Sequence, residues 1–210
     1  MINVLIVDDH PIVRAGLKQI LKGTADIQVA EEANNGQEAL QKILENDFDV
    51  VLLDISMPGR SGLDILRELK GIKSDLHVLI LSTFSEQQYA VRALKAGAAG
   101  YLTKESAPDE LIAAIRKVSL GGKYLSMALA EKLAETLADH GDKLPEEMLS
   151  DREHQVMCMI ASGKTVKEIA TELSLSVKTI STYRRRILEK LKMKNNAEIT
   201  HYAIQRGLVN

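Results

Sequence analysis

The chain has 210 residues, of which 45% are hydrophobic and 27% are charged, and its net charge at pH 7 is −2. This length permits one large domain or two small ones, each with a hydrophobic core. No apolar stretch approaches the roughly 18 residues needed to cross a membrane, and the N-terminus has neither a basic region nor a small-residue cleavage site, so we expect a soluble cytoplasmic protein with no membrane partner.

Short apolar runs alternate with helical patterns along residues 1–120. Each run is rich in Val, Ile or Leu, which indicates strands buried on both faces of a parallel sheet. We expect strands at 4–7, 28–33, 50–53, 78–81 and 100–103, and helices at 10–21, 35–46, 62–72, 86–96 and 108–120. The charged 28–33 run belongs at a sheet edge. The alternation predicts an α/β fold with a doubly wound, five-stranded parallel sheet of the flavodoxin-like kind.

Residues 121–210 have a different pattern, which begins where Gly121-Gly122 breaks the alternation. A short helix is expected at 127–139, followed by a polar tether at 140–147. Ser150 and Glu153 fit a capping box at the start of a helix. Four helices are then expected, at 151–161, 166–173, 177–191 and 197–206. The sequence thus predicts domains at 1–120 and 148–210, with a linker at 121–147 that contains a short helix.

The net charge of the chain hides a division between these two domains. From Met148 to Asn210 there are eleven lysines and arginines against six acidic residues, a surplus of +5, so the remainder of the chain carries −7. An acidic first part and a basic last part indicate two different roles. Nucleic acid is the expected partner of the basic part.

Chemically active residues stand at the carboxyl ends of the expected strands. Asp8 and Asp9 follow VLIV, Asp54 follows VVLL, Ser82 follows VLIL, and Lys104 follows GYLT. Because parallel strands bring these ends to one crevice, we expect the five side chains to meet. Three carboxylates together need a cation, and their hard oxygen donors suit Mg²⁺. Asp54 would then be a carboxylate nucleophile for a phosphoryl group, with Lys104 neutralising charge and Ser82 offering a hydroxyl.

These residues resemble the receiver domains of two-component response regulators over the whole of 1–120. The resemblance implies that Asp54 accepts a phosphoryl group from a sensor histidine kinase and that Lys104 binds that group. It implies that Ser82 and Tyr101 form a switch pair, although Tyr101 alone would suggest an aromatic at the core edge. The implied Mg²⁺ ligands are Asp9, Asp54 and the Ser56 backbone carbonyl directly, and Asp8 through water.

Two positions depart from the family's pattern, and one neighbour of the acids invites another interpretation. Ser82 stands where threonine is commoner, which keeps the hydroxyl. Glu105 replaces the proline that often follows the lysine, so a cis peptide after Lys104 is less assured. His10 beside Asp9 suggests a metal ligand or a general base, but its place before Pro11 favours a helix start.

The basic part contains SVKTISTYRRRILEKL, which has two distinct helical faces. Ile180, Ile187 and Leu191 share one face, with Leu188 beside them, and polar residues at helical spacing form the other. The preceding KTVKEIATELSLS resembles the first helix and turn of a helix-turn-helix motif, whose second helix enters the major groove of DNA. The alternative interpretation is that this helix only presents a charged face to solvent and binds no DNA.

Together, LSDRE, SGKTVKEIA, LSLSVKTIS and ILEKL resemble the LuxR-type output domain. The whole chain is then similar to a NarL/FixJ-class response regulator, and STYRRRI with AEITHYAIQRGL to GacA-type regulators. The resemblance implies that base edges are contacted by Ser181, Thr182 and Arg185. Phosphates would be held by Thr165, Val166, Lys178, Thr179 and Arg186.

We therefore predict a transcription regulator that binds double-stranded promoter DNA, pairs as a homodimer on phosphorylation and could also contact RNA polymerase. Apart from gaining and losing its own phosphoryl group, it is not expected to be an enzyme. One alternative is a metal-dependent phosphohydrolase with an aspartyl intermediate, which usually needs a second acid that the segment Asp54-Ile-Ser lacks. Another is a receiver whose output binds RNA or protein.

Overall fold

The computed structural model describes residues 1–84, 86–127, 129–131 and 145–209. The chain forms two compact units, Met1–Glu131 and Lys132–Asn210. The predicted helix at 127–139 lies mostly outside the described residues, as does the first part of the tether at 140–144. No helix within the described ranges is long and apolar enough to cross a membrane.

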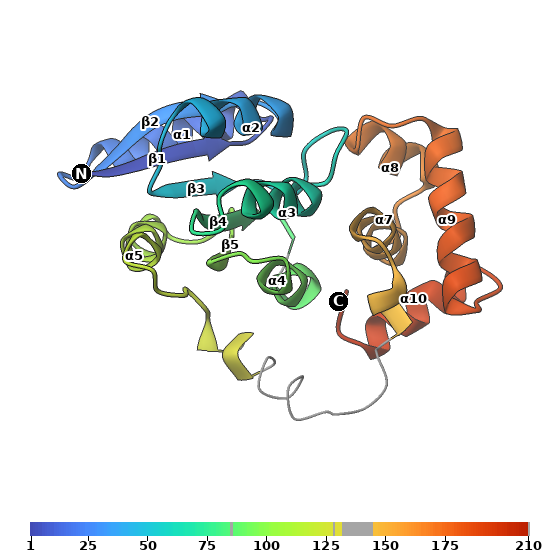
Figure 1. The fold of residues 1–210 in the computed structure, drawn as a ribbon. Coiled ribbons are helices and arrows are strands. Elements are labelled where there is room, and N and C mark those ends of the chain that lie inside the picture. The colour runs from blue at the N-terminus through green and yellow to red at the C-terminus, as the bar shows by residue number, and fades with distance from the viewer. Residues whose placement is uncertain (85, 128, 132–144, 210) are drawn as a thin grey trace. The chain divides into compact units, whose positions relative to one another are not determined.

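The first unit is built on a five-stranded sheet with strand order β2-β1-β3-β4-β5 (Figure 1). All of its strand pairs are parallel. The strands are β1 (Ile2–Val7), β2 (Ile27–Ala33), β3 (Val50–Leu53), β4 (His77–Ser82) and β5 (Gly100–Thr103). The three central strands are almost wholly buried, whereas the charged β2 lies at the edge. The predicted doubly wound sheet is confirmed, because continuous apolar runs are stable only where both faces are covered.

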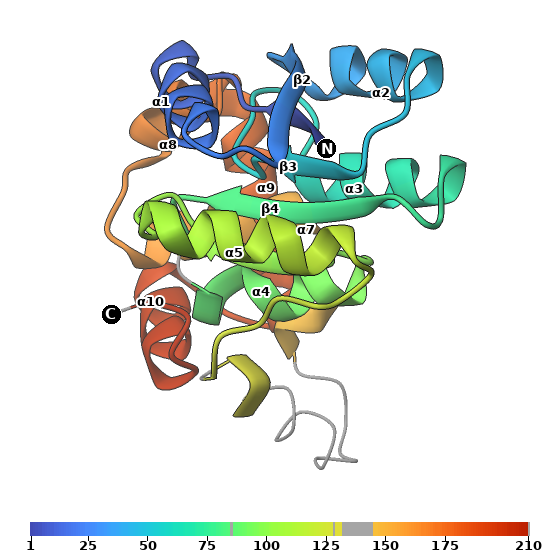
Figure 2. The same ribbon diagram turned by 90° about the vertical axis from the view of Figure 1, so that its left-hand side faces the viewer.

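Helices cover both faces of this sheet. They are α1 (Pro11–Lys22), α2 (Gly36–Glu45), α3 (Gly62–Ile72), α4 (Glu86–Lys95) and α5 (Pro108–Ser119). Leu17 and Leu21 of α1 share one buried cluster with Leu111 and Ile115 of α5 and with alternate residues of the strands. Figure 2 shows α5 lying across this face of the sheet. The loops at the carboxyl ends of β1, β3, β4 and β5 are thereby held on a rigid core.

Gly62 is the point where α3 packs directly against the end of β3. A Cβ atom at this position would lie 2.4 Å from the Asp54 carbonyl oxygen and 2.4 Å from Ile55 Cα. Both are backbone atoms, so the strand end or the helix must shift. We expect Gly62→Ala to lower the free energy of unfolding by about 1–3 kcal/mol, as overpacking of a core does.

Gly16→Ala is the matched control for this substitution. Gly16 lies within α1, and a Cβ there would meet nothing within 4 Å. Alanine should therefore raise the free energy of unfolding by about 0.5–1 kcal/mol, because glycine is the poorer helix residue. Urea unfolding of both variants measures the two effects. Equal changes in the two variants would show that the α3–β3 contact is not tight.

The second unit contains a short 3-10 helix followed by four α-helices, drawn in orange to red in Figure 1. They are η1 (Pro145–Met148), α7 (Asp151–Ala161), α8 (Val166–Glu172), α9 (Val177–Leu191) and α10 (Asn196–Gln205). The predicted capping box is confirmed, because Ser150 accepts a hydrogen bond from the Glu153 amide while the Glu153 side chain bonds back to the Ser150 amide. Ile180 and Ile187 of α9 are fully buried, as the apolar face predicts.

The prediction of a polar tether is wrong for its last part, because residues 145–147 belong to η1. Two contacts hold this turn to the helices of its own unit. Tyr202 of α10 donates a hydrogen bond from its hydroxyl to Glu146, and Lys190 Nζ of α9 lies 3.3 Å from the Met148 carbonyl oxygen. The sequence shows only Pro145 and acidic residues here, so these tertiary contacts have no local signal.

Candidate functional site

Two aspartates lie side by side because they follow neighbouring strands. Asp8 comes directly after β1 and Asp54 directly after β3, and these strands pair in register up to Val7 and Leu53. Backbone hydrogen bonds from the Asp8 amide to Ala33 and from the Asp54 amide to Val7 continue the ladder. Asp8 is 2% exposed and Asp54 1% exposed. The two carboxylates are thus fixed at the bottom of a crevice, as predicted.

Lys104 reaches this crevice from the end of β5. Its amide donates to the Ser82 carbonyl oxygen at the end of β4, which fixes the backbone. Its Nζ lies 2.8 Å from Asp54 Oδ2 and 2.6 Å from Asp8 Oδ2. The peptide that follows it is trans. Asp8 and Lys104, which lie about a hundred residues apart in the sequence, therefore meet Asp54 at the Lys104 ammonium group.

The buried carboxylates of Asp8 and Asp54 face a single ammonium group, that of Lys104, so negative charge exceeds positive charge among these three side chains. Burial raises the pKa of Asp54, and the neighbouring Asp8 adds to that rise, while Lys104 opposes it. Burial would lower the pKa of Lys104, but attraction to Asp54 and Asp8 outweighs it, so the lysine pKa lies above its ordinary value. Burial is thus the main cause of the raised Asp54 pKa, whereas the two carboxylates are the cause of the raised Lys104 pKa.

The donor set fits a hard divalent cation. Asp8, Asp9, His10 and Asp54 each offer one atom, and these four atoms all lie within 4.8 Å of one another. Among the described residues, Asp9 Oδ1 and the Ser56 hydroxyl are buried without a hydrogen-bond partner. Three carboxylates and one ammonium carry a formal charge of −2, which a divalent ion would balance. Asp54 Oδ1 already accepts a hydrogen bond of 2.8 Å from the Ser56 amide, which orients its other oxygen toward Lys104.

The sequence interpretation weighed a role for His10 beside the acids and favoured a helix start instead. His10 precedes α1 as predicted, but its side chain makes no cap hydrogen bond. Instead, Nδ1 lies 3.2 Å from Asp8 Oδ1 and 3.0 Å from Asp9 Oδ1. Arg14 supports the same loop by donating to the Asp8 carbonyl oxygen over 2.7 Å. The position of His10 directly after Asp8 and Asp9 was the sequence signal for the approach of its ring.

Ser82 and Tyr101 both contact the loop that follows β4. Ser82 is completely buried, and its Oγ accepts a hydrogen bond of 3.1 Å from the Phe84 amide. Tyr101 is also fully buried, and its hydroxyl donates to the Phe84 carbonyl oxygen over 2.8 Å. Burial raises the pKa of the Tyr101 phenol, so it remains a donor at physiological pH. The two residues of the predicted switch pair therefore both bond to the backbone of Phe84.

The second unit presents α9 as a helix with one free basic face. The N-terminus of α9 is capped by Ser176, and that of α8 by Thr165. Lys178, Ser181, Arg185 and Arg186 are exposed, and the Arg185 side chain is 71% accessible. These side chains lie opposite the buried Ile180 and Ile187. The arrangement suits a helix that lays its polar face in a groove of a nucleic acid.

Three of the predicted contact residues already have hydrogen-bond partners within their own helices. The Thr165 hydroxyl donates to Glu168, the Thr182 hydroxyl donates to the Lys178 carbonyl oxygen, and Thr179 shares a hydrogen bond with Ser176. Val166 has no polar side chain, but it is the first residue of α8, where the backbone amides are free to bind an anion. The Thr182 hydroxyl can still accept a hydrogen bond from a base edge, whereas Thr165, Val166 and Thr179 suit contacts with the phosphate backbone.

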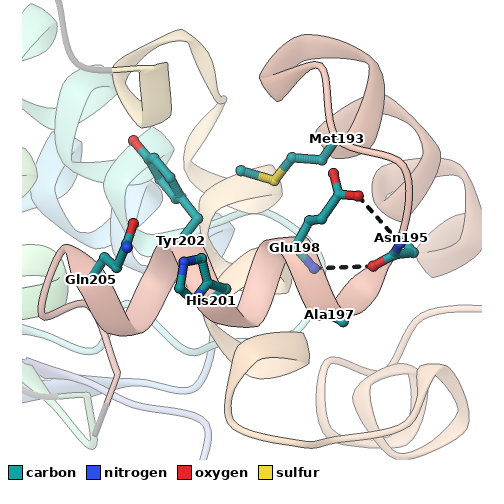
Figure 3. Close-up of a pocket in the computed structure, with 7 residues that line it drawn as sticks. All are labelled: Met193, Asn195, Ala197, Glu198, His201, Tyr202 and Gln205. Carbon is teal, nitrogen blue, oxygen red and sulfur yellow. Dashed lines mark hydrogen bonds between the residues drawn. The ribbon is translucent and has the colours of Figure 1, made fainter.

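A pocket of about 440 Å³ lies on the outer side of α10 (Figure 3). Asn195 caps the helix by accepting from the Glu198 amide, and its side-chain amide donates back to Glu198 over 3.3 Å. The remaining lining is a mixture of apolar and polar side chains: Met193, Ala197, His201, Tyr202 and Gln205. Ile204 is 54% exposed on the same helix. Tyr202 also contacts η1 through its hydroxyl, so the pocket extends from α10 toward that turn.

Comparisons with known proteins find relatives of both units. A model of the response regulator receiver domain matches residues 4–116, and a model of the luxR family of bacterial regulatory proteins matches residues 147–203. Response regulator UvrY of Escherichia coli (strain K12) is 41% identical over all of this chain and 97% of its own length. Response regulator GacA of Pseudomonas viridiflava is 39% identical over all of this chain and 99% of its own. A solved structure of two RcsB dimers bound to two parallel DNAs is similar with a TM-score of 0.60 and 26% identity, over 100% of this chain and 99% of that one.

Proposed function

This chain belongs to the two-component response regulators that join a receiver domain to a LuxR-type helix-turn-helix domain, and we propose that a phosphoryl group on Asp54 controls its binding to promoter DNA. The observation that carries the proposal is the buried Asp54 carboxylate, held 2.8 Å from the Lys104 ammonium at the ends of two parallel strands. We take a sensor histidine kinase as the donor. The domains are assigned to 1–120 and 148–210, with the linker at 121–147.

In the proposed reaction, an Asp54 carboxylate oxygen attacks the phosphorus atom of a phosphohistidine or of a small acyl phosphate. The new O–P bond forms as the bond from phosphorus to the donor nitrogen or oxygen breaks, and the donor leaves with that electron pair. Lys104 neutralises charge on the equatorial oxygens of the phosphoryl group. Asp8 holds the Lys104 ammonium in place from its other side, over 2.6 Å.

We propose Mg²⁺ as the cofactor, with Asp9, Asp54 and the Ser56 carbonyl as direct ligands and Asp8 through water. When bound, the ion supplies charge stabilisation for the phosphoryl oxygens. The buried Asp9 Oδ1 supports this assignment, because it lies within 4.8 Å of donor atoms from Asp8, His10 and Asp54, and clustered carboxylates repel one another unless a cation lies among them.

The phosphoryl group then acts on the chain through Ser82. A phosphoryl oxygen is a stronger acceptor than any neutral group nearby, so the Ser82 hydroxyl turns to donate to it. To reach that oxygen the Ser82 side chain rotates about its Cα–Cβ bond, and its Oγ then no longer accepts the hydrogen bond of 3.1 Å from the Phe84 amide. The segment after β4 moves, and Tyr101, which holds the Phe84 carbonyl oxygen, follows it. This proposal makes Ser82 and Tyr101 positioning residues for the switch.

The output of the switch is DNA binding through α9. We propose that base edges are contacted by Ser181, Thr182 and Arg185, and that phosphates are held by Thr165, Val166, Lys178, Thr179 and Arg186. RNA polymerase is the further partner that a promoter-bound regulator would meet. We place the protein in the cytoplasm, because its DNA target lies there, and we assign it no enzymatic activity beyond its own phosphorylation and dephosphorylation.

Arg185→Ala should weaken binding to the specific DNA site by about 1–3 kcal/mol if the guanidinium pairs with a guanine edge. Lys178→Ala is the matched control, because it removes one exposed cation from the same helix. It should weaken binding to every DNA sequence by the same factor. It should also reduce by about 1 the steepness with which the logarithm of the binding constant falls with the logarithm of the salt concentration. Titration of specific and scrambled duplexes at several salt concentrations measures both effects. An equal loss on every sequence for both variants would show that Arg185 contacts only phosphate.

Two other functions can be separated from this one by experiment. A phosphohydrolase would turn over unrelated phosphate monoesters, but Asp54-Ile-Ser places no acid two residues after the nucleophile, so turnover should be negligible. If the second domain binds RNA or protein instead, the chain should show no salt-dependent binding to duplex DNA.

The deciding experiment is selection of genomic fragments by the full chain, with and without beryllofluoride and Mg²⁺. Enrichment of one sequence motif supports the proposal, and the absence of enrichment contradicts it.

A further inference from the structure

The residues that follow α5 lie along the free edge of the sheet. Tyr124 forms a parallel bridge with Gly100 of β5, and its amide donates to the Ala99 carbonyl oxygen over 2.9 Å. Lys123 Nζ donates to the Ala98 carbonyl oxygen over 2.8 Å. Two glycines make the turn from α5, with Gly121 at a φ of +82°. Residues 121–126, which we call the latch, thus cover an edge that would otherwise be open.

The Tyr124 side chain fixes the latch to α5 and to the core. Its ring packs against the buried cluster between α1, α5 and the sheet. Its hydroxyl donates to Glu110 over 3.3 Å, and Lys117 Nζ lies 5.9 Å from the ring centroid. A Cβ atom on Gly100 would lie 2.6 Å from the Tyr124 carbonyl oxygen. Glycine at this position is therefore what lets the latch approach β5 so closely.

A second anchor ties the latch to the start of α4. The Ser126 hydroxyl donates to the Glu86 carboxylate, and Ser126 Oγ also accepts a hydrogen bond of 3.1 Å from the Leu129 amide. Glu86 is the first residue of α4 and stands two positions after Phe84. Phe84 is the residue whose amide is held by Ser82 and whose carbonyl oxygen is held by Tyr101. A short run of backbone thus connects the phosphorylation site to the latch.

We propose that the latch is a phosphorylation-sensitive clasp, which is closed in the unmodified protein and loosened when Asp54 carries a phosphoryl group. The inference rests on the proposed function at Asp54. When Ser82 turns toward the phosphoryl group, the segment that leads to Glu86 shifts and the hydrogen bond from Ser126 is lost. The contacts of Lys123 and Tyr124 then hold the latch without this second anchor, so residues 121–126 open more often.

Release of the latch lengthens the tether that leads to the DNA-binding domain. Six residues freed in extended form add about 20 Å of reach, at roughly 3.3–3.6 Å for each residue. Adjacent half-sites on DNA lie about 34–36 Å apart, so an added reach of this size matters for two domains that must bind together. The clasp would therefore restrict the search of each DNA-binding domain until the receiver is phosphorylated.

Hydrogen exchange of the full chain tests the clasp, because local opening exposes amides that are otherwise bonded. The readout is the exchange rate of peptides that cover residues 121–131, with and without beryllofluoride and Mg²⁺. We expect activation to raise that rate about tenfold, as the loss of a hydrogen bond to a charged group does. Ser126→Ala should show the raised rate without activation and little further response. Ser126→Thr, which keeps the hydroxyl, should behave as the wild type.

Ser119→Ala is the control, because that hydroxyl bonds only within α5, to the Arg116 carbonyl oxygen. It should leave the exchange of the latch unchanged. Peptides that contain Ser82 and Lys104 report whether beryllofluoride has bound. The clasp is overturned if beryllofluoride changes the exchange of the Ser82 and Lys104 peptides but not that of residues 121–131. It is also overturned if residues 121–131 of Ser126→Ala exchange at the wild-type rate without activation. If neither region responds, phosphorylation control at Asp54 fails, and the clasp fails with it.

Discussion

Asp54→Asn should abolish phosphorylation of the chain by acetyl phosphate, because an amide lacks the negative charge that makes the carboxylate a nucleophile. We expect a loss of more than a hundredfold, measured as the mass of one phosphoryl group on the intact protein. In the wild type the label should be lost on treatment with hydroxylamine, as an acyl phosphate is. Chelation of divalent ions should also prevent labelling, and added Mg²⁺ should restore it.

This substitution should not unfold the protein, so a negative result can be interpreted. Asp54→Asn leaves Asp8 and Lys104 as a balanced pair, 2.6 Å apart, and reduces the formal charge of the cluster from −2 to −1. Because burial raises the pKa of Asp54, the charged form is costly in the folded state, and a neutral amide relieves that cost. Thermal unfolding should show a variant at least as stable as the wild type in the absence of metal.

Asp64→Asn is the matched control for phosphorylation. Asp64 lies in the first turn of α3, and its side chain is 48% exposed, away from Lys104. It should accept the label at the wild-type rate. If Asp54→Asn is labelled as fast as Asp64→Asn, the phosphoacceptor is another residue, and the mechanism proposed for Lys104 and Ser82 would have to be abandoned.

The sheet and the crevice were predictable because their signals are local. Four strands are continuous apolar runs, and each ends in the polar residue that the site uses, so parallel topology alone places Asp8, Asp54 and Lys104 together. The family resemblance that these motifs implied is confirmed by the comparisons. The roles of individual site residues remain predictions, because geometry shows proximity and not reaction.

The features that escaped prediction depend on contacts between distant segments. Tyr124 joins the sheet through a single bridge, which is too short to produce any periodic pattern. Pro145–Met148 fold into a turn because Tyr202 and Lys190 hold them from α10 and α9. In both cases the partner lies in another element, and nothing in the local sequence specifies it.

Phosphorylation should cause the chain to pair as a two-fold dimer on DNA. A single short recognition helix contacts too few base pairs to distinguish one site in a genome, and two half-sites related by protein symmetry supply the missing discrimination. The candidate surfaces are the receiver faces at 86–96 and 108–120 and the outer side of α10 at 200–205. Sedimentation with and without beryllofluoride, alone and on a duplex with two half-sites, should show two protomers for each duplex only in the activated form.

Ile204→Asp tests the α10 surface, because the native side chain is 54% exposed on the helix that contributes most of the pocket lining in Figure 3. Burial of an isoleucine at an interface contributes about 1.5–3 kcal/mol, so its replacement by a charge should weaken binding to the two-site duplex at least tenfold. Binding to a single half-site should be unchanged. Ile12→Asp is the control, because Ile12 is 86% exposed on α1, outside every candidate surface. One protomer per duplex at saturation in the activated wild type, or an equal effect of both substitutions, would show that the protein does not pair through α10.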